Sequence, residues 1–395
     1  MAEPLKVSLT GATGSVGRQA LSLARAFPER MKIVALGGWG NVAALAESAL
    51  EFKPPLVGTR GEAERETLRE LLRARGNYLP EIATGREGQL MVAAESGADA
   101  LVSAISGAAG LAPTYAALEK GLRVALANKE SLVLAGDLLL PRRASQIFPV
   151  DSEHGAIFQA LGGTLDSPEP YGIILTASGG PFRGKTLPQL ACVTPQEAAK
   201  HPTWAMGPKI TCESALLFNK GLEVIEARHL FNVPPERIRV LVHPQSVIHS
   251  MVEKRDGSVI AQLGPSDMRL PLAYALSCPE RWPLGSLETG ASPLGIPAMD
   301  WSSPLTFEEP DRAVFKCLPL AEEAVRVGRS APLVYNAAGE VGVEAFFAGR
   351  ISFLAIADLV EECLNAIPLK TLNSVPEIEE ENLLARAKAS ALLAR

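Results

Sequence analysis

A glycine-rich loop stands directly between the first apolar run and the first helical pattern of the chain. The run at residues 6–9 leads into residues 11–17, Gly-Ala-Thr-Gly-Ser-Val-Gly, and a helical pattern covers 16–27. Such glycines let the backbone turn tightly and approach a pyrophosphate, which the N–H groups at a helix N-terminus attract. The glycine spacing alone is a weak signal, but this setting predicts dinucleotide binding. A tight turn without a ligand is the alternative.

Short aliphatic runs alternate with helical patterns through the first 150 residues. This alternation predicts an α/β fold with an N-terminal Rossmann-like parallel sheet. The expected strands are 6–9, 32–36, 100–105, 123–127 and 147–150, and two of the expected helices are 16–27 and 43–51. We therefore expect a dinucleotide-binding domain at 1–150.

The pattern changes after residue 171, where strands and helices no longer alternate. Further strands are expected at 171–176, 238–242, 246–252 and 259–263, with a hairpin at Asp256-Gly257, and a helix at 214–230. These elements predict a central α+β domain at 151–284, which the family resemblance described below implies to be the catalytic domain. A linker rich in Gly, Pro and Ser follows at 285–310, and a C-terminal helical domain at 311–395 has expected helices at 313–327, 333–348, 353–365 and 378–393.

Composition excludes several classes of protein. The net charge is -6, from 38 basic and 44 acidic residues, which argues against a nucleic-acid partner. The five cysteines form no C-x-x-C pair, so a disulfide scaffold and a thiolate zinc site are not expected, and a reducing compartment is. We find no signal-peptide pattern and no uninterrupted apolar stretch of membrane-spanning length. A cytoplasmic protein without a membrane partner is expected.

The loop after the second expected strand is where a ribose-binding residue belongs. Gly37-Gly38-Trp39-Gly40-Asn41 contains no acid, which disfavours NAD, and no Lys or Arg to bind a 2′-phosphate. Arg60, after the third strand, is a candidate substitute.

Carboxylates follow the strand at 147–150. Asp151 and Glu153 are two positions apart, so on an extended backbone they point the same way, at the carboxyl end of a parallel strand. Oxygen ligands of this kind suit Mg²⁺ or Mn²⁺. Capping of a helix that begins near Glu153 is the alternative.

A second polar set lies on the helix expected at 214–230. Asn219 and Glu223 are separated by four positions and share a face, with Lys220 beside them. Glu223 is a candidate third carboxylate ligand, whereas we expect Glu226 to be a solvated charge.

Histidines and strand ends supply further candidates. His201 precedes Trp204 and Met206 in a loop bounded by Pro202 and Gly207, a composition typical of a lid over a ligand. His243 and His249 fall on expected strands and are interpreted as structural. Asn128, Lys129 and Glu130 follow the strand at 123–127, and Glu130 could equally begin a helix.

Taken together, these motifs resemble the 1-deoxy-D-xylulose 5-phosphate reductoisomerase family from the first strand into the C-terminal helices. The matching segments are 13–15, 104–111, 127–132, 149–154, 178–182, 201–207, 219–223 and 243–250. The combination of residues 149–154 with residues 219–223 is highly specific.

The resemblance implies a role for each matching residue. Asp151, Glu153 and Glu223 would bind Mg²⁺ or Mn²⁺. The phosphate end of the substrate would be held by Ser178, Ser214, Asn219 and Lys220, and the sugar by Lys129, Ser152, Glu153 and His201. The NADPH site would be lined by Thr13, Gly14, Ser15, Val16, Asn41, Asn128, Glu130 and Gly207. A homodimer is implied as well.

Departures from the family pattern occur at three places. Gly40 stands where Lys or Arg usually precedes Asn41, which predicts a weaker preference for NADPH over NADH. Residues 213–218 read Glu-Ser-Ala-Leu-Leu-Phe instead of Asp-Ser-Ala-Thr-Met-Met. Residues 336–339 read Asn-Ala-Ala-Gly instead of Asn-Ala-Ala-Asn.

The implied activity is conversion of 1-deoxy-D-xylulose 5-phosphate to 2-C-methyl-D-erythritol 4-phosphate, the second step of the methylerythritol phosphate route to isoprenoids. It combines metal-assisted rearrangement of the carbon skeleton with hydride transfer from NADPH. A metal-dependent sugar-phosphate isomerase or aldolase without a redox step is the first alternative. A non-catalytic NADP-sensing protein is the second.

Overall fold

The computed structural model describes residues 3–394 except 77, 141–142, 166–170, 203–206, 286–291, 293 and 300. Contacts divide the chain into two compact units. Unit 1 consists of Met1–Ser131, Arg143–Gly155 and Asp267–Ala298, and unit 2 of Leu132–Arg142, Ala156–Ser266 and Met299–Arg395. No helix in the described ranges is long and apolar enough to cross a membrane.

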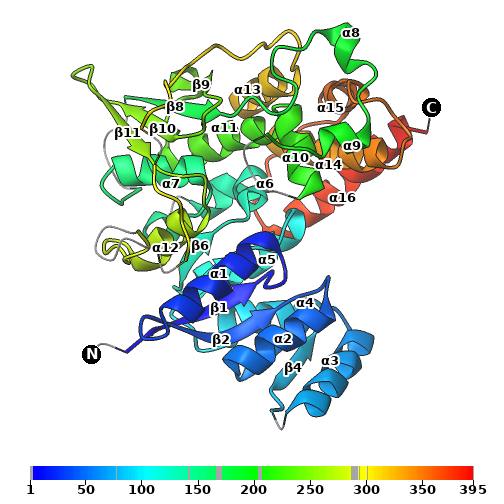
Figure 1. Ribbon diagram of the computed structural model, residues 1–395. Coiled ribbons are helices and arrows are strands. Elements are labelled where there is room, and N and C mark those ends of the chain that lie inside the picture. Colours follow the sequence, from blue (N-terminus) through cyan, green and yellow to red (C-terminus); the bar gives the residue numbers. More distant parts are fainter. Residues whose placement is uncertain are drawn as a thin grey trace. The chain divides into compact units, whose positions relative to one another are not determined.

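Unit 1 is built on a parallel sheet, whose strands β1 and β2 are labelled in Figure 1. In the described part of the chain this sheet has seven strands in the order β4-β3-β2-β1-β5-β6-β7. The strands are β1 (Leu5–Thr10), β2 (Met31–Gly37), β3 (Leu56–Thr59), β4 (Glu81–Thr84), β5 (Ala100–Ser103), β6 (Arg123–Leu126) and β7 (Ile147–Pro149). The predicted Rossmann-like parallel sheet is confirmed. Strand order reverses between β1 and β5, and ligands of such sheets bind at this point.

Helices connect the strands of unit 1. They are α1 (Ser15–Ala26), α2 (Val42–Phe52), α3 (Glu62–Arg75), α4 (Gly85–Leu90), α5 (Leu111–Glu119) and α12 (Arg269–Ser277), while α6 (Lys129–Leu139) and α7 (Ser152–Ala160) continue into unit 2. Helix α12, which sequence patterns did not predict to be part of this unit, packs against α1, β6 and β7. Its Leu272 joins the same apolar core as Leu9 of β1 and Leu45 of α2. The three-domain division at 150, 284 and 310 stays a prediction.

Unit 2 contains a mixed sheet, with four strands among the described residues in the order β11-β10-β8-β9. Its strands are β8 (Gly172–Ala177), β9 (Ile238–Val242), β10 (Ile248–Glu253) and β11 (Val259–Leu263). The hairpin predicted at Asp256-Gly257 is confirmed, and Gly257 supplies the positive φ of 85° that the turn requires. The helices of this unit are α8 (Leu187–Leu190), α9 (Pro195–Ala198), α10 (Pro208–Ala215), α11 (Phe218–Phe231), α13 (Cys317–Val327), α14 (Ala331–Phe347), α15 (Ala355–Ala366) and α16 (Val375–Leu392).

The prediction of a single helix at 214–230 is wrong. Two helices, α10 and α11, meet at Leu217, whose φ of 55° breaks the helical path. Leu216, Leu217 and Phe218 are all buried. Consecutive residues of one helix point in directions about 100° apart, so a straight helix could not bury all three against one core. The break allows it, and it places Ser214 and Asn219 on different helices.

Candidate active site

The glycine loop after β1 is shaped for close backbone approach. Gly11 has a φ of 75°, and a Cβ there would lie 2.2 Å from the Ala104 carbonyl oxygen in the loop after β5. A Cβ at Gly17 would lie 2.3 Å from the Gly11 carbonyl oxygen. Helix α1 begins at Ser15 without a side-chain cap and without an acid in its first turn. Its first N–H groups and its dipole therefore favour an anion, next to Thr13, Gly14, Ser15 and Val16.

Two of the predicted nucleotide-site residues tie neighbouring loops together. The carboxylate of Glu130 accepts hydrogen bonds from the Gly107 N–H (2.9 Å) and from Asn128 Nδ2 (2.8 Å). Asn128 Nδ2 also donates to the Gly107 carbonyl oxygen (3.0 Å), and its Oδ1 accepts from the Ser131 N–H (3.2 Å). Asn128 and Glu130 thus fix the loop after β5 at the point where strand order reverses.

The loop after β2 carries Gly40 and Asn41. Asn41 caps α2, because its Oδ1 accepts a hydrogen bond from the Ala44 N–H at 3.0 Å. Gly40 is exposed, and a Cβ added there would meet nothing within 4 Å. The Gly38 N–H donates to the Gly58 carbonyl oxygen (3.0 Å), so this loop is hydrogen-bonded to β3. Arg60, the residue directly after β3, is exposed.

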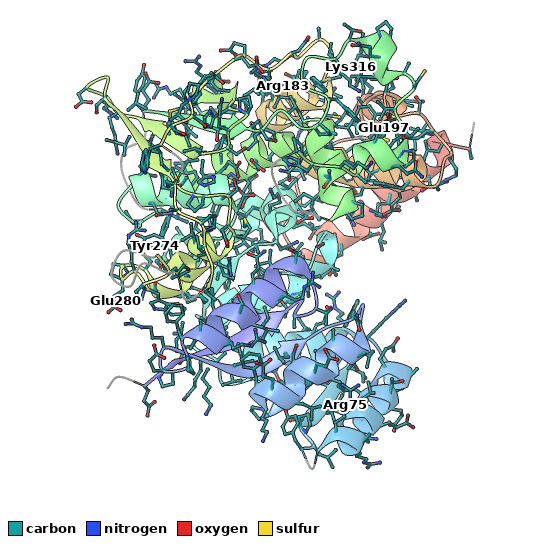
Figure 2. The ribbon with its side chains drawn as sticks, in the orientation of Figure 1. Arg75, Arg183, Glu197, Tyr274, Glu280 and Lys316 are labelled. Carbon is teal, nitrogen blue, oxygen red and sulfur yellow. The ribbon has the colours of Figure 1, made fainter. Side chains whose placement is uncertain are left out.

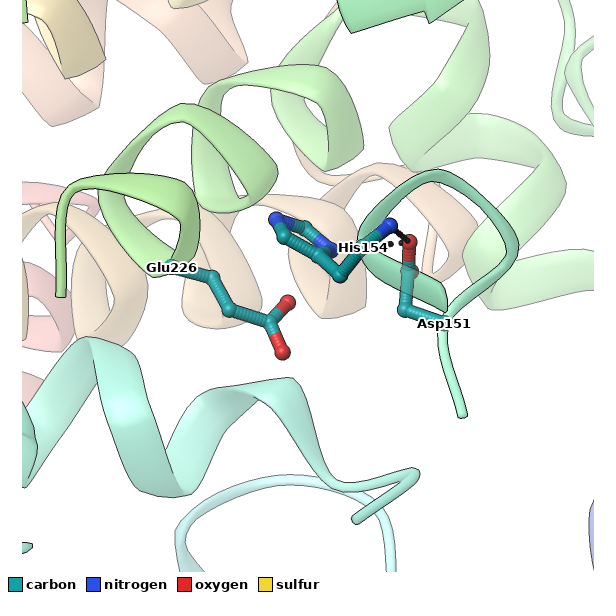
Figure 3. Close-up of side chains that lie close together, drawn as sticks. All are labelled: Asp151, His154 and Glu226. Atoms are coloured by element: carbon teal, nitrogen blue, oxygen red, sulfur yellow. Dashed lines mark hydrogen bonds and ion pairs between the residues drawn. The ribbon is translucent and has the colours of Figure 1, made fainter. Parts of the chain in front are cut away.

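Asp151 and Lys129 come from the carboxyl ends of two adjacent strands. Lys129 follows β6 and Asp151 follows β7, and Lys129 Nζ lies 2.5 Å from Asp151 Oδ2. The other oxygen, Oδ1, accepts from the Glu153 N–H (3.1 Å) and lies 2.9 Å from His154 Nδ1 (Figure 3). Asp151 is therefore the N-cap of α7, the alternative that its sequence left open, and at the same time a buried, ion-paired carboxylate.

Glu153 and Ser152 lie in the first turn of α7. Ser152 Oγ donates to Glu153 Oε2 at 2.6 Å, and both residues are partly buried. The positive end of the helix dipole stabilises the negative charge of Asp151 and Glu153. Unit 1 therefore brings together Lys129, Asp151, Ser152 and Glu153.

In unit 2, a second group surrounds the end of β8. Ser178 Oγ lies 3.0 Å from His201 Nε2. Burial lowers the pKa of His201, which keeps the ring neutral at pH 7. Gly180, with a φ of 67°, packs so closely on α10 that a Cβ would lie 2.9 Å from the Ser214 carbonyl oxygen. Ser178, His201 and the end of α10 thus form one neighbourhood.

The loop after β8 is also tied to the last residues of the predicted linker at 285–310. Arg183 Nη1, labelled in Figure 2, donates to Glu308 Oε1 at 2.9 Å. Glu308 itself pairs with Val242 of β9 through backbone hydrogen bonds. Gly207 is the N-cap of α10. Trp204 and Met206 lie outside the described residues, so the lid stays a prediction.

On α11, Asn219, Lys220 and Glu223 share one face as expected. Asn219 Nδ2 donates to Glu223 Oε1 (2.5 Å), and Lys220 Nζ donates to Glu223 Oε2. Lys220 and Glu223 are buried. The expectation that Glu226 is solvated is wrong, since its side chain is buried one turn further along. Helix α11 is covered by α13, α14 and β9, so almost none of its surface reaches solvent.

Two histidines interpreted as structural have different surroundings. His243 is structural: its Nδ1 donates to the Thr306 carbonyl oxygen (2.9 Å), and its Nε2 accepts from the Val247 and Ile248 N–H groups. His249 of β10 is near the candidate site. Burial lowers the pKa of His249, and the charge of Lys220 lowers it further. Its Nε2 also lies 3.1 Å from the Gly264 carbonyl oxygen, which is a structural contact. The sequence could not show that His249 lies near Lys220, because the two residues belong to different elements.

Comparisons with known proteins point to one family. Three family models match: 1-deoxy-D-xylulose 5-phosphate reductoisomerase at residues 7–136, its C-terminal domain at 147–231, and the DXP reductoisomerase C-terminal domain at 263–388. A 1-deoxy-D-xylulose 5-phosphate reductoisomerase of Trichlorobacter lovleyi is 48% identical over 387 residues, which is 97% of this chain and 96% of that one. The Chlorobaculum tepidum enzyme of the same name is 48% identical over 390 residues, 98% of this chain and 99% of that one.

The chain belongs to the 1-deoxy-D-xylulose 5-phosphate reductoisomerase family.

Solved structures of the family have the same fold. A crystal structure of DOX-P reductoisomerase in complex with NADPH, fosmidomycin and magnesium superposes with a TM-score of 0.91 at 37% identity, covering 99% of this chain and 98% of that one. The reductoisomerase of Zymomonas mobilis in complex with NADPH has a TM-score of 0.88 at 40% identity, covering 99% of both chains. The family resemblance drawn from the motifs is thereby confirmed.

Proposed function

We propose that this protein converts 1-deoxy-D-xylulose 5-phosphate to 2-C-methyl-D-erythritol 4-phosphate, using NADPH and a divalent metal ion. The observation that carries the proposal is membership in the reductoisomerase family over nearly the whole chain, with no departure at a proposed metal ligand. When bound, NADPH supplies the hydride, and Mg²⁺ or Mn²⁺ polarises the substrate ketone and stabilises negative charge on its oxygens.

Asp151, Glu153 and Glu223 would hold the metal ion. Their carboxylate oxygens are hard donors, which fit Mg²⁺ or Mn²⁺ and not a soft metal. Lys129 is paired with Asp151, and Lys220 with Glu223. These lysines hold the carboxylates in place, which prepares the site for a cation and for the anionic oxygens of a substrate.

The remaining site residues would bind and orient the substrate. Ser178, Ser214, Asn219 and Lys220 would hold the phosphate, while Lys129, Ser152, Glu153 and His201 would contact the sugar. Neutral His201 offers a hydrogen bond without adding a positive charge. In unit 1, Thr13, Gly14, Ser15 and Val16 would hold the nucleotide phosphates, and Asn41, Asn128 and Glu130 would border the site together with Gly207 of α10.

The direct test is an assay with purified protein, 1-deoxy-D-xylulose 5-phosphate, NADPH or NADH, and Mg²⁺ or Mn²⁺. We expect loss of NADPH absorbance that requires substrate and metal, with 2-C-methyl-D-erythritol 4-phosphate as the product by mass spectrometry. Rearranged product without NADPH oxidation would indicate an isomerase or aldolase instead. No turnover, with nucleotide still bound, would favour a sensing protein.

We also propose a cytoplasmic homodimer. The odd number of scattered cysteines suits a reducing compartment. In the described part of the chain the five cysteines form no disulfide, and four of them are buried. Sedimentation equilibrium tests the dimer: a single species of about the monomer mass of 41.8 kDa would contradict it.

A further inference from the structure

Helices α11 and α14 interlock through two contacts between a ring and a glycine, both within unit 2. Phe218, the first residue of α11, lies over Gly339 of α14, where an added Cβ would be 2.1 Å from two carbons of the ring. In the opposite direction, Tyr335 of α14 lies over Gly221 of α11, where a Cβ would be 2.4 Å from the hydroxyl oxygen. Each helix thus supplies one ring and one glycine.

The two rings also contact each other. Phe218 and Tyr335 stack with centroids 4.6 Å apart and planes inclined by 15°, and both side chains are fully buried. The Tyr335 hydroxyl lies 3.3 Å from the Phe218 carbonyl oxygen and 3.1 Å from that of Cys317. This interlock leaves α11 little freedom to slide along α14 or to rotate against it, because close-packed interiors tolerate few alternative arrangements.

Two of the departures from the family pattern meet at this contact. This chain has Phe218 and Gly339 where the family resemblance implies Met and Asn. The larger side chain on α11 occupies the space that an Asn side chain on α14 would need. The two changes therefore compensate in volume, although they are far apart in the sequence.

We propose that Phe218 and Gly339 form a mutually dependent pair of positioning residues that sets the first turn of α11. That turn carries Asn219 and Lys220, and the next turn carries Glu223. Side chains project from a helix in fixed directions, so a shift of α11 moves all three together. The role in substrate binding rests on the proposed function, in which Asn219 and Lys220 hold the phosphate.

The test compares Gly339→Ala with the double variant Phe218→Leu/Gly339→Ala. Gly339→Ala forces the Phe218 ring aside, so we expect the KM for 1-deoxy-D-xylulose 5-phosphate to rise about tenfold, with kcat changed less and NADPH affinity unchanged. The smaller Leu makes room for the new methyl group, and the double variant should return to within about threefold of the wild-type KM. Gly342→Ala on the same helix is the matched control, because its Cβ would lie 3.0 Å or more from its neighbours, the nearest being a side-chain methyl of Ile356.

A folded Gly339→Ala variant with the wild-type KM would overturn the proposal, as would a double variant no better than the single one. If Gly339→Ala does not fold, Phe218→Leu alone decides: it opens space instead of closing it, and we expect its KM to rise about threefold. A wild-type KM for Phe218→Leu would then overturn the proposal. An inactive wild-type protein would count against the proposed function instead. In that case the interlock is tested by whether the melting temperatures of the single and double variants are non-additive.

Discussion

The two units prepare their parts of the proposed active site by different means. In unit 1, the nucleotide end is shaped by backbone: Gly11 and Gly17 bring N–H groups to the start of α1, and hardly any side chain is needed. In unit 2, the proposed phosphate end depends on side chains of α11, a buried helix that packs against α13 and α14. The first design should be sensitive to added atoms, and the second to removed charges and to small helix shifts.

Asp151 and Glu223, two of the proposed metal ligands, also differ in whether backbone or side chains hold them in place. Asp151 is held by backbone at a helix N-cap and by Lys129, whereas Glu223 is held within its own helix by Asn219 and Lys220. Each is buried and paired with a lysine. If both serve one metal ion, their removal should have equal consequences in spite of these different supports.

The largest effect is expected from Asp151→Asn or Glu223→Gln. Each change removes one anionic metal ligand, so kcat should fall by about a thousandfold or more, equivalent to about 4 kcal/mol. NADPH binding, measured by fluorescence titration, should persist in both. Asp137→Asn is a suitable control, since Asp137 is 86% exposed and its ion pair is with His229. Normal turnover of either variant would remove that residue from the metal site.

A smaller effect, confined to the nucleotide, is expected from Gly17→Ala. The new Cβ would lie 2.3 Å from the Gly11 carbonyl oxygen and must displace the loop, so NADPH affinity should fall about thirtyfold, or 2 kcal/mol. Gly76→Ala in the same unit provides the control, because its nearest contact would be an ordinary 3.6 Å from Leu50. Unchanged NADPH affinity of the folded Gly17→Ala variant would show that the loop does not contact the nucleotide.

Lys220→Ala should affect the sugar phosphate and not the nucleotide. A lost phosphate contact weakens ground state and transition state alike, so the KM for substrate should rise about tenfold or more while kcat changes less. Steady-state kinetics at saturating NADPH measures the split. A variant that loses kcat with an unchanged KM would place Lys220 at the reacting carbon atoms instead.

The sequence was sufficient for features that depend on local pattern. Strand and helix periodicity located β1, β2, β5, β6 and β7 to within two residues, and helical spacing placed Asn219 and Glu223 on one face. It was not sufficient for features that depend on how segments distant in the sequence pack into the same core. The break at Leu217, the burial of Glu226 and the return of α12 to unit 1 all depend on tertiary packing. The contact between Phe218 and Gly339 is of the same kind, since neither residue by itself predicts the other as its neighbour.

Unit 2 should also differ from unit 1 in how strongly its stability falls at low pH. Burial lowers the pKa of His201, His229 and His249, all in this unit. Their charged forms are disfavoured by the fold, so stability is fully present above the unfolded histidine pKa of about 6.5 and is lost as pH falls through the lower folded values. Urea unfolding followed across this range should show the decline. His229→Gln should make the decline shallower, and an identical pH profile would contradict the assignment to His229.

The smallest effect is expected at Gly40, and it concerns the choice of nucleotide. Without Lys or Arg at this position, the preference for NADPH over NADH in kcat/KM should stay below about a thousandfold, or 4 kcal/mol. Gly40 is exposed, and a Cβ there would meet nothing within 4 Å, so Gly40→Arg should fold normally and place a cation beside the nucleotide 2′-phosphate. The preference should then rise about tenfold, mainly through a lower KM for NADPH. Gly40→Gln, of similar size without charge, is the control. If the wild-type preference already exceeds a thousandfold, Arg60 at the end of β3 is the first cation to test, because the loop after β2 is hydrogen-bonded to that strand.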